Sequence, residues 1–403
     1  MPKIPKVVLL IESSRASGRA LLSGIAEYSH HHGPWSFLWE PGGLEKARPL
    51  LAAGDADGII LRDVKDVGKI LARGLPAVVV GHRQTEMQDR VNVVTDSEAI
   101  GRMGAEHLLG CGFKHFAFCS FMRTPQENNT WAKIRETHFA ERIRAAGFEP
   151  AHFELAATTP NWSRELLQLS RWLAALPKPL GLMACNDDCS QRVMEACKLA
   201  GLTVPDMVGV IGVDNDDVIC GLTDPPMSSI AINFKRAGYE AAQALDGLLR
   251  RSKSVPRRII AQASHIVARR STDFVAAADP HLAKALRFIR DQGRNLVSVD
   301  QVARAAGLSR RALEKRFRTF LGRSILEEIR RVHTDQIARV LVETDLPVNQ
   351  IAELHGFADA QHFARYFRAG KKLTPLAYRR VFGSKHARPV RAQNGDSFSQ
   401  SGV

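Results

Sequence analysis

Acidic and amide side chains follow three apolar runs in the first part of the chain. Asp96 follows VNVVT, Asn186 leads the run Asn-Asp-Asp after GLMAC, and Asp214 opens the run DNDD after VGVIGV. Carboxylates grouped in this way could perform acid–base catalysis, hold a divalent cation, or accept hydrogen bonds from sugar hydroxyls. They could equally cap the helices that follow, because Asp and Asn are favoured at helix N-termini. The spacing alone leaves these alternatives open.

The sequence motifs of common enzyme classes are absent. There is no GxGxxG after a strand, no GxxxxGK[ST], no GxSxG and no HExxH. The six cysteines form no CxxC and are followed by no His at zinc-finger spacing, so we interpret them as reduced, packed thiols. We therefore expect no enzyme activity, no cofactor and no metal.

The last third of the chain contains one unit twice. Residues 299–320 and 348–369 share a polar-Gln-β-branched-Ala start, a Gly four residues after that Ala (Gly307, Gly356) and a basic amphipathic second half. A short helix, a Gly turn and a second helix form a helix-turn-helix, which lays its second helix in the DNA major groove. Two copies predict that one chain reads two successive grooves.

The expected DNA-contacting side chains lie opposite the apolar positions of each second helix. Leu313 and Phe317 in the first unit, and Phe363 and Phe367 in the second, should face inward. Arg and Lys suit guanine, Gln suits adenine, Glu suits cytosine, and Ala suits a thymine methyl group. The alternative for any one charged side chain is a solvated helix face. The expected base-reading residues are Ser309, Arg310, Arg311, Glu314, Lys315, Ala360, Gln361, His362 and Arg365; the expected phosphate contacts are Arg316, Arg318, Lys371, Lys372, Arg379 and Arg380.

Charge supports this division of the chain. Residues 281–403 contain 23 Lys and Arg against 11 Asp and Glu, a net of +12 out of +14 for the whole chain. Residues 1–280 are nearly neutral, so the excess positive charge lies on the segment with the repeats, as a polyanion-binding part requires.

A length of 403 residues indicates two or three domains. No apolar run approaches twenty residues, and the run at 7–11 is too short for a signal peptide, so we expect a soluble cytoplasmic protein with no membrane partner.

The first 270 residues alternate short β-branched runs with amphipathic helical stretches. Such alternation predicts parallel sheets covered by helices on both faces, and the pattern restarts after about residue 115. We therefore predict an α/β part with two lobes and a ligand cleft at the carboxyl ends of the strands, followed by an all-α part. A single long helix over residues 325–342 should hold the two helix-turn-helix units apart.

The last hundred residues resemble the DNA-binding domain of AraC/XylS-type regulators. The matching segments are LSRRALEKRF with Leu321-Gly322, HGFADAQHFARYFR, and Leu373-Thr374-Pro375. Lys372 stands where the family usually has a Gly, two residues before Thr-Pro. The first part resembles the effector domains of LacI/GalR regulators and periplasmic sugar-binding proteins, most clearly over GLMACNDDCSQRVMEACKLAGLTVPDMVGVIGVDND.

The second resemblance implies a set of effector contacts, and their chemistry suits a sugar. Arg135 offers a planar fork for paired hydroxyls, and Trp162 offers a flat face for the C–H side of a sugar ring. Alternatively, Trp162 fixes the start of a helix, and Arg135 is an ordinary surface residue near Glu136 and Glu141. The implied contacts are Asp96, Arg135, Trp162, Asn186 and Asp214, with Arg19 at the start of the first helix as a further candidate.

The expected organisation is a sensor at residues 5–272, a linker at 273–280, a reader at 281–383 and a disordered tail at 384–403. A LacI-like sensor joined to an AraC-type reader resembles the activators of pentose operons, which implies a xylose-like effector, operator DNA, a homodimer and RNA polymerase as partners. Two rival hypotheses are a cytoplasmic sugar-binding or sugar-modifying protein with an incidental basic end, and a regulator of the same build that responds to a purine or an amino acid.

Overall fold

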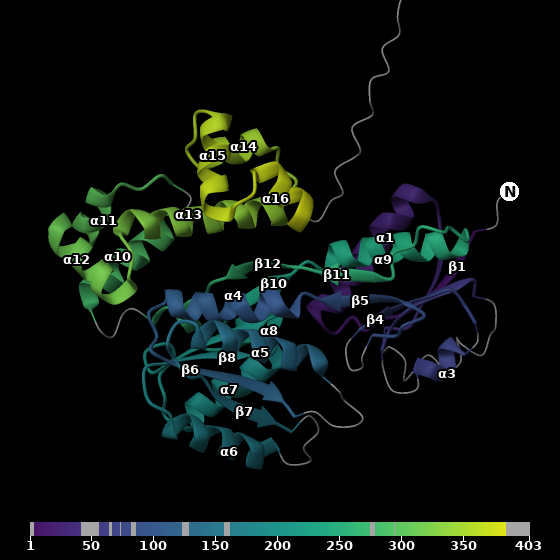
Figure 1. Cartoon of the computed structure of the whole chain (residues 1–403), viewed down its shortest axis with the longest axis horizontal. Coiled ribbons are helices and arrows are strands. Elements are labelled where there is room, and N and C mark those ends of the chain that lie inside the picture. Colours follow the sequence, from purple (N-terminus) through teal and green to yellow (C-terminus); the bar gives the residue numbers. More distant parts are fainter. Residues whose placement is uncertain are drawn as a thin grey trace, which may run out of the picture.

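The computed structural model describes residues 4–41, 56–63, 67–72, 74–81, 86–122, 129–156, 162–274, 279–293 and 295–383. Two α/β lobes lie side by side, and a helical part rests along them (Figure 1). The predicted linker lies partly, and the predicted tail wholly, outside these residues. Among the described helices, none is long and apolar enough to cross a membrane.

The first lobe is a parallel sheet in the order β11-β5-β4-β3-β1-β2. Its helices α1 and α9 pack so closely that a Cβ on Gly24 or Gly238 would meet the backbone of the other helix. The elements are β1 (Lys6–Leu10), α1 (Ala16–His32), β2 (Ser36–Trp39), β3 (Gly58–Arg62), α3 (Val67–Leu71), β4 (Ala77–Val80), β5 (Val91–Thr95), α9 (Phe234–Leu249) and β11 (Arg258–Ala261).

The second lobe has the order β12-β10-β9-β8-β6-β7 and is parallel except for the β10–β12 pair. Its central strands β8 and β9 are buried along their whole length, which explains their continuous apolar sequence. The elements are α4 (Ser97–Gly110), β6 (His115–Phe121), α5 (Thr130–Arg144), β7 (Ala151–Leu155), α6 (Trp162–Ala175), β8 (Leu180–Ala184), α7 (Asp187–Leu199), β9 (Val208–Val213), α8 (Asp217–Leu222), β10 (Ser228–Ile232) and β12 (Ala263–Val267).

The chain crosses between the lobes three times, and we call these crossings the hinge. They lie at Asp96 between β5 and α4, at Asn233 between β10 and α9, and at Gln262 between β11 and β12. Asn233 N donates to Gln262 O at 2.9 Å, and Asp96 N donates to Ala261 O at 3.1 Å. The three crossings are therefore hydrogen-bonded to one another.

The C-terminal part is all helical and has two small cores. Leu313 and Phe317 are buried in one, and Phe363 and Phe367 in the other. α13 joins the two cores, and its 19 residues span about 28 Å at 1.5 Å per residue. The helices are α10 (Pro280–Asp291), α11 (Val299–Ala306), α12 (Arg310–Leu321), α13 (Ile325–Glu343), α14 (Val348–Leu354), α15 (Ala360–Lys371) and α16 (Pro375–Phe382). The predicted fold class, two α/β lobes followed by an all-α part, is confirmed.

Candidate functional site

Three strand ends and one helix meet between the lobes. Thr95 ends β5 and Asp96 follows it, Cys185 and Asn186 follow β8, and Asp214 follows β9. Arg135 on α5 is buried here, at 2% exposure. It donates to Cys185 O in the second lobe and to Thr95 Oγ1 in the first at 3.4 Å, so one guanidinium contacts both lobes. Arg135 is therefore no ordinary surface residue.

Asp214 is held in an unusual backbone conformation beside this guanidinium. Its φ is 105°, which side-chain-bearing residues rarely adopt. Burial raises the pKa of its carboxyl, while the guanidiniums of Arg135, Arg62 and Arg15 oppose that rise. Within the described part of the chain, the carboxylate accepts no direct hydrogen bond. Asp214 is thus a charged acceptor held in the cleft by its backbone.

Asp96 and Asn186 act as helix caps. An oxygen of the Asp96 carboxylate accepts from Ala99 N at 3.1 Å, and Asn186 Oδ1 accepts from Cys189 N at 2.9 Å. Capping, one of the alternatives left open by the sequence, therefore applies to both residues. The cap fixes each side chain just past its strand, and Asn186 Nδ2 also donates to Asp188 Oδ2 at 3.5 Å.

Asp187 has a structural role that the sequence did not single out. Its carboxylate is 2% exposed and accepts from Ser229 Oγ at 2.7 Å and from Asp216 N at 2.8 Å. Burial, with Asp214 nearby, raises its pKa to about 8. These bonds tie β10 and the turn after β9 to the start of α7. Asp187 thereby supports the backbone that presents Asp214.

Arg19 and Trp162 lie at the rim. Arg19 Nη1 donates to Ser13 O at 2.9 Å and to Ser14 O at 3.1 Å, and its other terminal nitrogen is 3.9 Å from Asp216. Trp162 begins α6 and is 48% exposed, with the guanidinium of Arg192 4.8 Å from its ring centre. Among the described residues, no contact joins Trp162 to Arg135 or Asp214.

Sequence reasoning missed two residues close to this site, Arg62 in the first lobe and Trp131 on α5 in the second. Arg62, at the end of β3, is 6% exposed, and its Nε lies 2.7 Å from Glu12 while Nη2 donates to Ser17 Oγ at 3.1 Å. The ring of Trp131 lies 4.5 Å from the Arg135 guanidinium. Arg62 directly follows the apolar run GIIL, the same strand-end signal that marked Asp214.

The lobes touch directly across the cleft. Arg15 forms an ion pair with Asp188, and Ala16 N donates to Asp216 Oδ2 at 2.7 Å. α1 has no side-chain cap from its own N-cap residue, so the Asp216 carboxylate from the second lobe fills that role. In the part of the chain that the structure describes, no group of His, Cys, Asp or Glu could hold a metal ion.

The predicted base-reading side chains form two exposed faces. Leu313 and Phe317 point into one core and Phe363 and Phe367 into the other, as predicted, so the polar side chains lie outside. Ser309 Oγ accepts from Ala312 N at 3.3 Å, and Asp359 caps α15 by accepting from Gln361 N and His362 N. Exposed are Ser309, Arg310, Arg311, Lys315, Ala360, Gln361, His362 and Arg365, while Glu314 is half-buried and its carboxylate accepts from Ile325 N.

Three of the expected phosphate contacts are engaged within the protein. Arg316 pairs with Asp279 at 2.7 Å, Lys371 pairs with Asp335 at 2.5 Å, and Arg379 Nε donates to Leu341 O at 3.1 Å. Arg318, Lys372 and Arg380 are exposed. The exposed three are the better candidates for phosphate.

Known proteins share both parts in this order. A family profile for the periplasmic binding protein-like domain matches residues 105–272, and a profile for a helix-turn-helix domain matches residues 302–381. The xylose operon regulatory protein of Escherichia coli K12 is 29% identical over 386 residues, covering 93% of this chain and 97% of that protein. This chain is a transcription regulator resembling that protein. Its relative from Haemophilus influenzae is 26% identical over 93% of this chain and 98% of its own length.

A solved structure agrees with this assignment. The structure of a xylose-binding transcription activator, xylR, aligns with a TM-score of 0.61 and 28% identity, covering 95% of this chain and 99% of that chain. A transcriptional regulator CelR–cellobiose complex aligns with 67% of this chain at a TM-score of 0.53 and 20% identity, which shows a shared sensor fold. The predicted AraC-type reader behind a periplasmic-binding-protein-like sensor is confirmed, as is the prediction that the regulator is not an enzyme.

Proposed function

We propose that the chain is a sugar-responsive activator that binds a xylose-like pentose and operator DNA. The observation that carries this proposal is that the Arg135 guanidinium contacts both lobes close to the Asp214 carboxylate, in one chain with two exposed basic recognition faces. The similarity to a protein named for xylose supports the choice of sugar.

A pentose has the chemistry to fill this cleft. Arg135 Nε is buried without a hydrogen-bond partner among the described residues. Among the same residues, none donates a hydrogen bond to the half-buried Asp214 carboxylate. Buried polar groups left unpaired are costly, and sugar hydroxyls both donate and accept. Bound sugar would therefore favour the state in which the lobes meet, as a shift between populations that already exist.

The two recognition helices suit successive turns of one DNA face. α13 spans about 28 Å, close to the roughly 34 Å of one helical turn. We propose that a homodimer in the cytoplasm places four such helices on paired half-sites, with RNA polymerase as a further partner. Sugar would change the orientation of the two readers.

A binding panel tests the effector and separates the rival functions. Thermal unfolding of the full chain is measured with D-xylose, other pentoses, hexoses, purines and amino acids, because a ligand of the native state raises apparent stability. We expect the largest shift with xylose, and salt-sensitive, operator-selective gel shifts that respond to it. Turnover of a sugar without DNA binding would instead identify a sugar-modifying protein, and a shift with a purine or an amino acid alone would replace the effector.

Paired variants test the sorting of DNA contacts. Arg311→Ala should cost about 1–3 kcal/mol at particular base pairs and relax specificity there. Lys372→Ala should weaken binding to all sequences alike and lower the salt slope by about one unit. Lys371→Ala is the matched control, since its ammonium is already paired with Asp335. Uniform weakening by Arg311→Ala across operator variants would remove Arg311 from base reading.

A further inference from the structure

The last helix of the reader ends on the hinge of the sensor. Tyr378 Oη in α16 donates to Ser264 O in β12 at 2.8 Å, and Tyr378 is buried. Just beyond, Asn233 Nδ2 donates to Phe382 O and to Gly383 O, the latter at 3.1 Å. Asn233 is one of the three hinge crossings. The second helix-turn-helix unit is therefore attached to the point about which the lobes would move.

Asn233 caps two helices with the two ends of one amide. Its Oδ1 accepts from Arg236 N at 3.1 Å, at the start of α9, and its Nδ2 serves the last carbonyls of α16. Those groups are helix-end donors and acceptors that lack partners within their own helix. The side chain is 8% exposed, so water cannot easily replace it.

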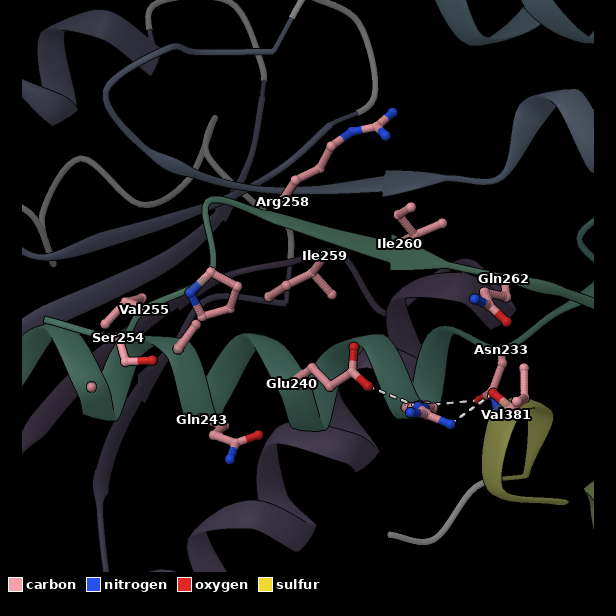
Figure 2. A pocket seen from close by; sticks show the side chains of 14 residues that line it. Asn233, Glu240, Gln243, Ser254, Val255, Arg258, Ile259, Ile260, Gln262 and Val381 are labelled. Atoms are coloured by element: carbon pink, nitrogen blue, oxygen red, sulfur yellow. Dashed lines mark hydrogen bonds and ion pairs between the residues drawn. The ribbon is translucent and has the colours of Figure 1, made fainter. Parts of the chain in front are cut away.

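Arg236 strengthens the same junction with charge. Its Nη1 donates to Val381 O at 2.7 Å and also to Arg380 O, while its Nε bonds Glu240 at 2.7 Å. A cation at a helix C-terminus is favourable because the helix dipole is negative there. Asn233, Glu240 and Val381 border one groove of about 430 Å³ between α9, β11 and α16 (Figure 2).

The reader also contacts the second lobe at two other places. Arg323, just before α13, donates to Gly110 O at the end of α4 at 2.7 Å, and α4 begins at Asp96 in the cleft. Glu343, at the end of α13, lies 3.3 Å from His265 Nε2 in β12. α13 thus lies over the second lobe, with a contact just before its first residue and another at its last residue (Figure 1).

We propose that this junction of α16 with Asn233 and Arg236, the hinge clamp, carries the effector signal to the reader. Hinge residues absorb the backbone rotation when lobes open or close. Asn233 N is bonded to Gln262 O, so rotation at either crossing moves the amide relative to the carbonyls of α16. The clamp therefore forms at one lobe angle and fixes the second recognition helix there. This inference rests on the proposed sugar response.

Asn233→Asp tests the clamp selectively. Asp keeps the acceptor that caps α9, but it removes the donor and places a negative charge against the carbonyls of α16. Gln243→Glu is the control, because it adds the same charge at an exposed position of α9 in the same groove. Operator affinity of the full chain is measured with and without saturating D-xylose.

We expect the ratio of operator affinity with D-xylose to operator affinity without it to fall to about 1 in Asn233→Asp. The same ratio should stay at the wild-type value in Gln243→Glu. D-xylose affinity without DNA should stay within about threefold of wild type, and hydrogen exchange of α16 should accelerate in Asn233→Asp alone. An Asn233→Asp protein that keeps the wild-type ratio, or whose α16 exchanges as in wild type, overturns the clamp. A wild-type chain that ignores D-xylose overturns the proposed function instead.

Discussion

At the scale of single residues, the charged groups of Arg135 and Asp214 have fewer hydrogen-bond partners among the described residues than they can accommodate. Arg135 uses one nitrogen on Cys185 O and another on Thr95 Oγ1, and its Nε is left buried and unpaired among the described residues. Burial lowers the pKa of this guanidinium, while Asp214 opposes that effect. An incoming group with donors and acceptors at sugar spacing would satisfy both side chains.

Asp214→Asn should weaken effector binding without unfolding the sensor. The substitution removes the charge from the acceptor, and a hydrogen bond to a charged group contributes about 1.5–3 kcal/mol, equivalent to a roughly 10–100-fold rise in Kd. Calorimetric titration with D-xylose measures it. Asp217→Asn is the matched control, since Asp217 is exposed three residues further on and pairs with Arg269. Equal affinities of the Asp214→Asn protein and wild type would exclude Asp214 from the site.

Buried histidines should make the second helix-turn-helix unit acid-sensitive. His333 Nδ1 lies 3.3 Å from Tyr366 Oη and its Nε2 lies 3.2 Å from His355 Nδ1, and burial followed by His355 lowers the pKa of His333 to about 4. The unfolded chain, with a pKa near 6.5, binds more protons between these values, so stability falls as pH drops from about 6.5 towards 4. Denaturant unfolding followed at several pH values checks this. In His333→Gln the loss of stability between about pH 6.5 and 4 should be smaller than in wild type. A pH profile identical to that of wild type would show that His333 does not cause the acid sensitivity.

At the scale of elements, the two helix-turn-helix units differ at one helix end. Gly322, the C-cap of α12, has a φ of 68°, and Lys372, the C-cap of α15, has a φ of 62°. The backbone therefore enters the left-handed region directly after both helices. A side chain costs about 1–2 kcal/mol in that region, whereas Gly does not incur the penalty. The departure from the AraC-type pattern thus leaves the geometry unchanged and stores strain.

Lys372→Gly should raise the stability of the reader by about 1 kcal/mol, because it relieves this strain. Lys372→Ala removes the same ammonium but keeps a Cβ, so it should leave stability near wild type. Chemical denaturation of the three proteins separates the two effects. Equal stabilities of the Gly and Ala variants would show that the left-handed turn carries no measurable strain.

Sequence periodicity predicted the fully buried elements well and the others poorly. The apolar runs at Ala77–Val80, Leu180–Ala184 and Val208–Val213 are typical of buried strands, and β4, β8 and β9 have the same bounds. Strands covered on both faces are continuous apolar runs, which makes their ends visible in the sequence. β7 and β11 were not anticipated, since their side chains alternate between buried and exposed over four or five residues. Short alternating runs do not stand out from loops in a single sequence.

Strand-end chemistry located part of the candidate cleft, and tertiary packing supplied the rest. Asp214 and Arg135 lie 79 positions apart in sequence, and only the family resemblance predicted that they belong to one site. Trp131 escaped notice because nothing in its local sequence indicates that two lobes will meet there, whereas Arg62 was passed over although it follows the apolar run GIIL. Nor could the clamp be predicted, because Asn233 acts on backbone carbonyls almost 150 residues away.

At the scale of the whole molecule, the lobes are joined by the hinge and by a second set of contacts, which we call the latch. The latch consists of the Arg15–Asp188 ion pair and of Asp216, which accepts from Ala16 N. It connects the N-terminal end of α1 in the first lobe to the starts of α7 and α8 in the second. These contacts exist only when the lobes meet, so they favour closure whether or not effector is bound.

Arg15→Gln should weaken effector binding by acting on closure. Exposed ion pairs contribute about 0–1 kcal/mol, so the closed fraction, and with it the apparent D-xylose affinity, should fall by at most about fivefold. Arg250→Gln is the control, because it breaks an exposed pair with Asp246 on α9, away from the cleft. Small-angle scattering of the effector-free protein should show a larger radius of gyration for Arg15→Gln alone. If affinity falls while the radius stays at the wild-type value, Arg15 contacts the sugar itself and the latch does not govern closure. If neither the D-xylose affinity nor the radius of gyration changes in Arg15→Gln, the hinge and the reader hold the lobes together. The clamp at Asn233 is then the contact that sets the angle between the lobes.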